Sequence, residues 1–178
     1  MKVFIGGARQ LRSLNPIVIT KLQNTINKNF EILIGDANGI DSSVQRYYSD
    51  NNYRSVIIYA SNGKVRNNIG QWNVISVDVP KGVTGFDFYV QKDIQMAKDA
   101  DYGFMIWNGK SRGTWNNVIN MTKQNKSVLL YLSVNKKIYK LSSLEEAEKF
   151  KKNIMTLSSQ RSVSVQVDTE EDNQLRLF

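Results

Sequence analysis

The sequence contains no cysteine and no histidine among its 178 residues. The absence of cysteine excludes disulfide bonds and thiol catalysis. The absence of histidine removes the most frequent general base and the most frequent transition-metal ligand. Any catalysis would therefore depend on carboxylates, hydroxyls, Lys, Arg or Tyr. We expect neither a metal site nor a bound cofactor.

Long apolar runs are also missing, so we expect no membrane span. The opening residues "MKVFIGGARQ" resemble a strand and a turn and not a signal peptide, which favours a cytoplasmic location. The formal net charge is +8. A basic chain suits an anionic partner such as a nucleotide or nucleic acid, although a solvated basic surface is the simpler explanation.

Short apolar segments alternate with amphipathic ones along most of the chain. Segments that are apolar throughout and separated by helices indicate a parallel sheet covered on both faces. We expect strands at residues 2–7, 31–36, 55–60, 74–80, 102–107 and 127–134. We expect helices at residues 15–30, 39–52, 85–101 and 113–125.

Apolar residues with helical spacing define the inward faces of these helices. In the first helix the inward set is Val18, Leu22, Ile26 and Phe30. In the third helix the pattern predicts an inward face of Phe86, Tyr89, Val90, Ile94 and Ala97.

The regular alternation of apolar and amphipathic segments ends at about residue 135. The segment "KKIYKL" predicts an added edge strand, and "SSLEEAEKFKKNIM" predicts a helix with a serine cap and glutamates in its first turn. We therefore expect a ligand-binding domain at residues 1–135, an added strand and helix at 136–160 packed on the same domain, and a polar tail at 161–178.

Glycines and polar residues follow three of the predicted strands. In a parallel sheet these turns share the carboxyl edge, where ligands bind at a switch in strand order. Glycine lets the backbone approach a ligand, and the helix that follows offers free N–H groups to an anion. The candidate ligand-binding residues at these turns are Gly6, Gly7, Arg9, Gly35, Asp36, Asn38, Gly39, Asp41, Asn108, Gly109, Lys110, Ser111, Arg112, Gly113 and Thr114.

The stretch "WNGKSRGTWNN" looks like the end of a phosphate-binding P-loop. A P-loop needs four residues between its first glycine and Gly-Lys-Ser/Thr. Here five residues separate Gly103 from Gly109, and most of them belong to a strand. The sequence therefore predicts a capped helix start with Arg112 at an anion site, or the same helix start with Lys110 and Arg112 merely solvated.

Two segments resemble motifs of one family. The stretch "GDANGIDSSVQRYY" is similar to "GGARGADxLAxxYA", and "KDIQMAKDADYGFMIWNGKSRGTWNNVI" is similar to "RNxxMAxxADxxxAFWDGxSRGTxxxI". Both motifs belong to the YspA-type branch of the SLOG superfamily, whose relatives include the lonely-guy phosphoribohydrolases, the DNA-processing protein DprA and nucleotide sensors. The resemblance covers roughly residues 1–132. It implies a Rossmann-like, mostly parallel sheet of six or seven strands and a pocket for a nucleotide or nucleotide-derived ligand.

The sequence departs from these relatives at two points. The catalytic glutamate of the phosphoribohydrolase motif "PGGxGTxxE" falls on Asn117, which cannot take up a proton. The arginine that stands before Asn in the YspA-type motif is replaced by Lys92, a further candidate ligand-binding residue, which precedes Asp93. Asp36, Asp41 and Asp93 remain as weak candidates for an acid or base, each with a purely structural alternative.

The binding of a nucleotide-derived small molecule, as a sensor or a sequestering protein, is thus the function that the sequence favours. A nucleotide N-glycosidic hydrolase or transferase is the first alternative. A DNA-associated accessory protein recruited through a sliding clamp is the second, because of the basic charge, the kinship to DprA and the C-terminal tail. A homo-oligomer is compatible with all three.

The residues "QLRLF" at 174–178 resemble the peptide motif that binds bacterial sliding clamps. Leu175, Leu177 and Phe178 would fill apolar pockets while Gln174 forms hydrogen bonds at the rim. The alternative is that Leu177 and Phe178 pack on their own domain.

The clamp motif makes a testable prediction. A fluorescent peptide "EEDNQLRLF" should bind a bacterial sliding clamp with micromolar affinity, because burial of two leucines and a phenylalanine contributes ~1.5–3 kcal/mol each against the cost of ordering the peptide. The same peptide with Leu177→Ala and Phe178→Ala should not bind. Equal binding of both peptides, or none near ~100 µM, would exclude the clamp.

Overall fold

The protein is built on a mixed seven-stranded sheet. The structure is a computed structural model, and it describes residues 1–160; the predicted clamp-binding residues Gln174, Leu175, Leu177 and Phe178 lie outside the described residues. The strands are β1 (Lys2–Gly7), β2 (Glu31–Gly35), β3 (Val56–Ser61), β4 (Asn73–Val77), β5 (Tyr102–Trp107), β6 (Val128–Leu132) and β7 (Lys137–Leu141). The helices are α1 (Pro16–Asn27), α2 (Ile40–Asp50), α3 (Gly85–Asp99), α4 (Arg112–Thr122) and α5 (Leu144–Gln160).

The strand order is β4-β3-β2-β1-β5-β6-β7, and β1 to β6 are parallel. β7 runs antiparallel to β6 at one edge. From β1 the chain builds outward through β2, β3 and β4, and it then returns to add β5 on the other side of β1. The strand order therefore reverses between β1 and β5, which is the place where open α/β sheets bind ligands. The predicted α/β, Rossmann-like fold class is confirmed.

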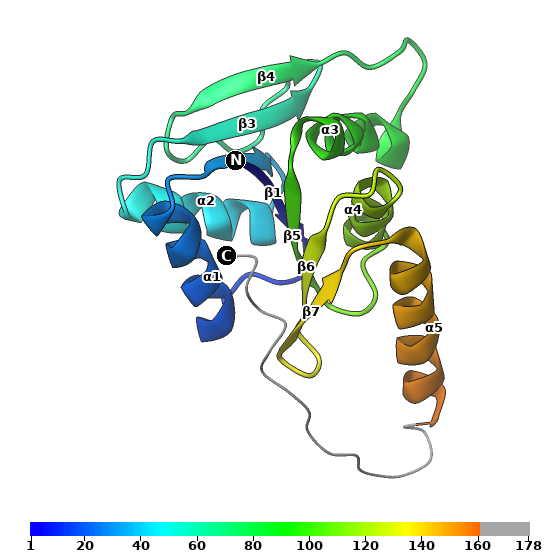
Figure 1. Ribbon diagram of the computed structural model, residues 1–178. Helices are drawn as coiled ribbons and strands as arrows, with labels where there is room; N and C mark the ends of the chain where they lie inside the picture. The colour runs from blue at the N-terminus through cyan, green and yellow to red at the C-terminus, as the bar shows by residue number, and fades with distance from the viewer. Residues whose placement is uncertain (161–178) are drawn as a thin grey trace.

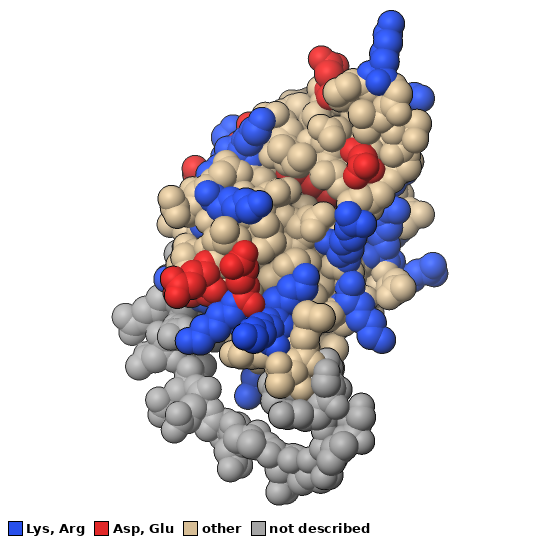
Figure 2. All heavy atoms as spheres, turned by 90° about the vertical axis from the view of Figure 1, so that its right-hand side faces the viewer, with Lys and Arg blue, Asp and Glu red and all other residues tan. Residues whose placement is uncertain are grey.

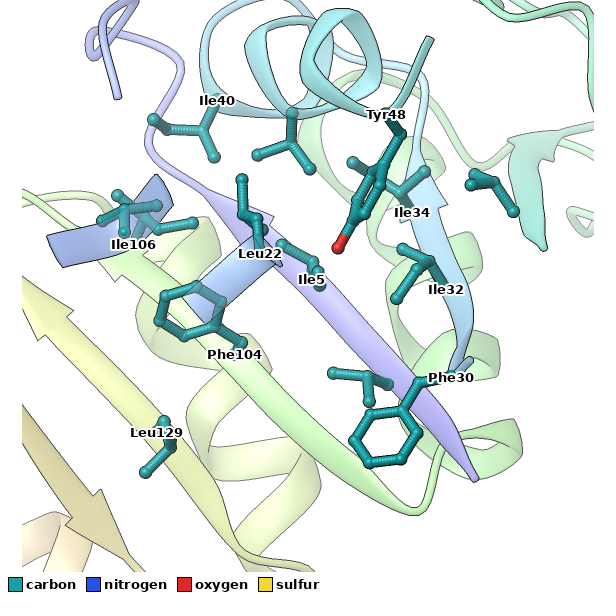
Figure 3. Packing of buried hydrophobic residues seen from close by; sticks show 14 of the residues in the cluster. Ile5, Leu22, Phe30, Ile32, Ile34, Ile40, Tyr48, Phe104, Ile106 and Leu129 are labelled. Atoms are coloured by element: carbon teal, nitrogen blue, oxygen red, sulfur yellow. The ribbon is translucent and has the colours of Figure 1, made fainter. Parts of the chain in front are cut away.

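Helices cover both faces of the sheet (Figure 1). Alternate residues of each strand point to opposite faces. In β1, Val3 and Ile5 pack with α1 and α2, whereas Phe4 packs with α3 and α4. Figure 3 shows the first of these two cores, in which Leu22 and Tyr48 lie against the side chains of β1, β2 and β5. Continuous apolar strands are needed because both faces are buried.

Two of the predicted helices differ from the structure. α1 ends at Asn27, because Asn29 takes a left-handed φ of 52°, so Phe30 reaches the core from the following turn. In α3 the prediction of an inward Phe86 was wrong: its side chain is 42% exposed. The first turn of α3 contacts the end of β3, where Ser61 Oγ donates to the Phe88 carbonyl at 2.8 Å, and the later part of the helix, with Met96 and Ala97, packs in the core of this face.

On the side of the molecule on which α5 lies, the charged side chains have no single focus (Figure 2). Figure 2 shows Lys and Arg side chains spread over the side on which α5 lies, with a group of Asp and Glu side chains among them. The net charge of +8 therefore does not by itself locate a binding site. Within residues 1–160, no helix is long and apolar enough to cross a membrane.

The packing of α1 makes a prediction about stability. Leu22 is fully buried, and Leu22→Ala should lower the free energy of unfolding by about 2–5 kcal/mol, because it leaves a cavity in the core. Ile17 lies on the same helix with 42% exposure, and Ile17→Ala should change that free energy by less than about 0.5 kcal/mol. Urea denaturation followed by tryptophan fluorescence measures both. Equal losses would contradict this packing.

Candidate functional site

A cleft of about 360 Å³ opens at the carboxyl edge of the sheet, where the strand order reverses. β1, β2 and β5 end at its base, and the first turns of α3 and α4 form its walls. The structure brings most of the predicted ligand-binding residues to this cleft. Those that line it are Gly6, Gly7, Arg9, Gly35, Asp41, Lys92, Asn108, Lys110, Ser111, Arg112, Gly113 and Thr114, together with Asp93.

Four predicted residues do not line the cleft. Asp36 is buried beside it and binds Arg66. Asn38 and Gly39 line a separate shallow pocket at the start of α2. Gly109 lies in the turn after β5 with a φ of 79°. Gly39 has a structural role, because its φ of 86° and its contact with the backbone of Arg9 leave no space for a side chain.

The turn between β5 and α4 is held by side chains. Asn108 Oδ1 accepts hydrogen bonds from the N–H groups of Lys110 and Ser111 at 3.0 and 2.8 Å. Trp107 Nε1 donates to the Ser111 carbonyl at 3.0 Å. Ser111 Oγ caps the helix by accepting from the Thr114 N–H at 3.4 Å and from its hydroxyl at 3.0 Å. The geometry is that of a capped helix start and not of a P-loop.

The start of α4 is positive and uncompensated. Its first turn contains no acidic residue, so nothing on the helix offsets the partial positive charge of its free N–H groups. Three cations stand around it: Arg9, Lys110 and Arg112. Within residues 1–160, no carboxylate forms an ion pair with any of these three side chains. The arrangement attracts an anion from solvent.

Two aromatic residues complete the wall of the cleft. The Arg112 guanidinium lies 4.9 Å from the ring centre of Phe86. The ring of Tyr89 faces two guanidinium groups, with Arg66 at 4.2 Å and Arg9 at 5.4 Å. The sequence pattern assigned both rings to the core. One feature of the sequence did favour a place at the cleft: both residues lie in the first turns of a helix that begins next to a glycine-containing loop.

Asp36 is held by Arg66, which lies in the irregular segment between β3 and β4 and was not among the predicted ligand-binding residues. Arg66 Nη2 and Nε donate to the two carboxylate oxygens at 2.6 and 3.0 Å, and the Arg66 N–H donates at 3.0 Å. Burial alone would raise the pKa of Asp36, but the hydrogen bonds from Arg66 and the charge of Lys92 hold that pKa below its ordinary value. This carboxylate is fully engaged in joining β2 to the loop before β4.

Lys92 and two carboxylates form the floor of the cleft. Lys92 Nζ donates to Asp93 Oδ1 at 2.7 Å and lies 4.0 Å from Asp36 Oδ1. Asp41 Oδ2 accepts from the Ala37 N–H at 3.2 Å. A Cβ atom on Gly35 would lie 2.5 Å from Lys92 Nζ and 2.6 Å from Asp41 Oδ2, so only glycine permits this approach.

The ionisation of the floor follows from burial and charge. Burial raises the pKa of Asp41 to about 6, with further increases from the charges of Asp93 and Asp36, while Lys92 and the Ala37 N–H oppose the shift. Burial would lower the pKa of Lys92, but Asp93 and Asp41 outweigh it and raise that pKa. Lys92 therefore stays an ammonium group, and Asp41 changes charge near neutral pH.

Asn117 also lines the cleft, 94% buried at the position where phosphoribohydrolases carry their glutamate. Its amide cannot exchange a proton with a reacting group. Within residues 1–160, no cluster of three or more acidic side chains has the geometry of a metal site.

Comparison with known proteins gives a structural relative only. No family model matches the chain, and no curated protein matches its sequence. Among solved structures, it resembles DNA processing protein A from Helicobacter pylori, which was studied for its binding of single-stranded DNA. The two share 17% identity over 90% of this chain and 81% of the other, with a TM-score of 0.58. At this identity the likeness shows the Rossmann-like fold alone.

The raised pKa of Asp41 predicts a specific pH dependence of stability. The folded protein holds this proton up to about pH 6, whereas the ordinary pKa is 3.8, so ionisation of Asp41 destabilises the fold as pH rises through this range. Between about pH 4.5 and 8, the wild type should lose roughly 2 kcal/mol of unfolding free energy relative to Asp41→Asn.

The matched control is Asp50→Asn, which removes an exposed carboxylate from the same helix. Its unfolding free energy, measured by urea denaturation at each pH, should follow the wild type. Parallel profiles for the wild type and Asp41→Asn would contradict the assignment.

Proposed function

We propose that the protein binds a nucleotide or nucleotide-derived small molecule in this cleft, with a phosphate group at the first turn of α4. One observation carries the proposal. Within residues 1–160, three cations without carboxylate partners and a helix start with no acidic residue in its first turn converge at the point where the strand order reverses. The segment that supplies this end of the cleft is the one that resembles the YspA-type motif.

The phosphate end is built for a compact anion. In the first turn of α4 the Thr114 N–H donates to Ser111 Oγ at 3.4 Å, and this cap fixes the direction of the Arg112 and Gly113 N–H groups, which have no partner within the helix. Arg112 and Arg9 add guanidinium groups, which bind phosphate oxygens in pairs, and Lys110 adds a point charge. Gly113 leaves the backbone open, because only the far edge of Phe86 lies near its missing Cβ.

The aromatic wall supports a ring-shaped ligand group. Phe86 is partly exposed at the rim, and Tyr89 lines the cleft one turn further along α3. A nucleobase stacked on either ring gains ~1–3 kcal/mol. The volume of about 360 Å³ lies at the small end of the range for ligand pockets and suits one mononucleotide.

The chemistry of the cleft favours binding over turnover. It contains no histidine, Asn117 stands at the glutamate position, and Asp93 is bound to Lys92. General acid–base help contributes ~10²–10⁴-fold to a rate, and Asn117 cannot supply it in place of the phosphoribohydrolase glutamate. Asp41, whose pKa is raised to about 6, is the remaining candidate acid or base in the cleft. A role in sensing or sequestering a nucleotide follows.

A DNA-associated role is the second candidate. The fold is that of DNA processing protein A, a single-stranded DNA-binding protein, and the cations at the mouth of the cleft would also attract a phosphodiester backbone. The first candidate function predicts tighter binding of a mononucleotide, and the second predicts tighter binding of single-stranded DNA. A mononucleotide should displace a fluorescent oligodeoxynucleotide if the cleft is a mononucleotide site, and should not if affinity depends on several linked phosphates.

The proposal predicts the effect of removing two cations. The double variant Lys110→Ala, Arg112→Ala should bind adenosine or guanosine 5′-monophosphate ~10-fold or more weakly than the wild type, because each charge-assisted hydrogen bond contributes ~1.5–3 kcal/mol. Isothermal titration calorimetry at low ionic strength measures this.

Lys149→Ala, which removes an exposed cation from α5, is the control and should leave the affinity within about twofold. The same affinity for the double variant and the wild type would reject the proposed phosphate site.

A further inference from the structure

The two ends of the cleft have opposite electrostatic character. The mouth carries Arg9, Lys110 and Arg112 with no carboxylate partner within residues 1–160. The floor carries two carboxylates around one ammonium group. When Asp41 and Asp93 are both ionised, the floor has a surplus negative charge, so a second phosphate group would be repelled there. The floor therefore requires a different part of the ligand.

Each carboxylate of the floor has one oxygen to spare. Asp93 Oδ1 accepts from Lys92, and Asp41 Oδ2 accepts from the Ala37 N–H. Within residues 1–160, neither Asp93 Oδ2 nor Asp41 Oδ1 accepts a hydrogen bond. Asp41 is 93% buried and Asp93 is 81% buried at its side chain, yet both line the cleft. Oxygens that face a cleft in this way are open to hydrogen bonds from water or from the donor groups of a ligand.

The ammonium group of Lys92 needs acceptors from a ligand, whereas the two carboxylates need donors. Lys92 Nζ has three N–H donors and forms one hydrogen bond, to Asp93, within the described chain. The floor therefore offers acceptors and a donor side by side. A hydroxyl group both donates and accepts, so it satisfies both, whereas an amino group donates only and would leave the ammonium protons unpaired.

We infer that Asp41, Lys92 and Asp93 bind the 2′,3′-diol of a ribose, so that the ligand is a ribonucleotide with both hydroxyl groups free. Two adjacent hydroxyls donate to the two spare carboxylate oxygens, and one of them accepts from Lys92. The inference rests on the proposed function, because the phosphate at α4 sets the direction of the ligand. It also separates the two candidate functions, since DNA lacks the 2′-hydroxyl and links the 3′-oxygen.

Gly35 makes this floor possible. Its missing side chain lets Lys92 Nζ and Asp41 Oδ2 reach the end of β2 together. The ligand hydroxyls would then lie close to the strand end, beneath the α4 turn. Selectivity for ribose would be a property of the cleft floor and not of the cationic mouth.

The test compares three ligands that differ only in the sugar: the 5′-monophosphates of adenosine, 2′-deoxyadenosine and 2′,3′-dideoxyadenosine, with the guanosine set in parallel. Calorimetry at pH 7.5 with the full chain should give at least ~10-fold tighter binding of the ribonucleotide than of the dideoxynucleotide. In Asp93→Asn this ratio should fall below about threefold, while the affinity for the dideoxynucleotide stays within about twofold of the wild type.

Asp87→Asn removes an exposed carboxylate from the same helix and should behave as the wild type. Equal and measurable binding of all three sugars by the wild type would overturn the inference and leave the proposed function standing. An equal loss of affinity for all three in Asp93→Asn would also overturn it, because the carboxylate would then be reading the base. Failure of every ligand to bind would reject the proposed function itself.

Discussion

One buried ammonium group holds the base of the cleft together. Lys92 is 97% buried, and its charge lies among three carboxylates that come from two parts of the chain: Asp36 and Asp41 after β2, and Asp93 beside it on α3. Arg66 neutralises Asp36 from the opposite side. Without Lys92, Asp41 and Asp93 would be left close together and uncompensated, which costs several kcal/mol in a buried site. The ammonium group thus fixes α3 against the end of β2.

That constraint determines what the cleft offers a ligand. Because α3 is anchored at Lys92, its first two turns lie beside the cleft and present Phe86 and Tyr89 as a wall. Asp41 and Asp93, the carboxylates around Lys92, also make the floor of the cleft negative. Within residues 1–160, the cations of the cleft that form no ion pair are Arg9, Lys110 and Arg112, around the start of α4. One ion-pair network therefore gives the cleft a cationic end, an aromatic side and a polar floor.

The fold class was predictable, whereas much of the site was not. Apolar strands alternating with amphipathic helices require a parallel sheet, and parallel strands bring their glycine turns to one edge, so the meeting of Gly7, Gly35 and Gly113 followed from local patterns. The pair between Asp36 and Arg66 spans 30 residues and joins a strand end to an irregular loop, for which periodicity carries no signal. The exposure of Phe86 was missed because helical spacing does not tell where a helix passes the edge of a sheet.

The central claim is that a nucleotide binds with its phosphate at the start of α4. The most direct measurement is a titration of ¹⁵N-labelled protein with adenosine or guanosine 5′-monophosphate, followed by backbone amide chemical shifts. The account predicts that the largest shifts occur at Gly113 and Thr114 and at Gly7, with smaller ones along the first turns of α3. Shifts confined to α5 and β7, or no shift at millimolar ligand, would contradict it.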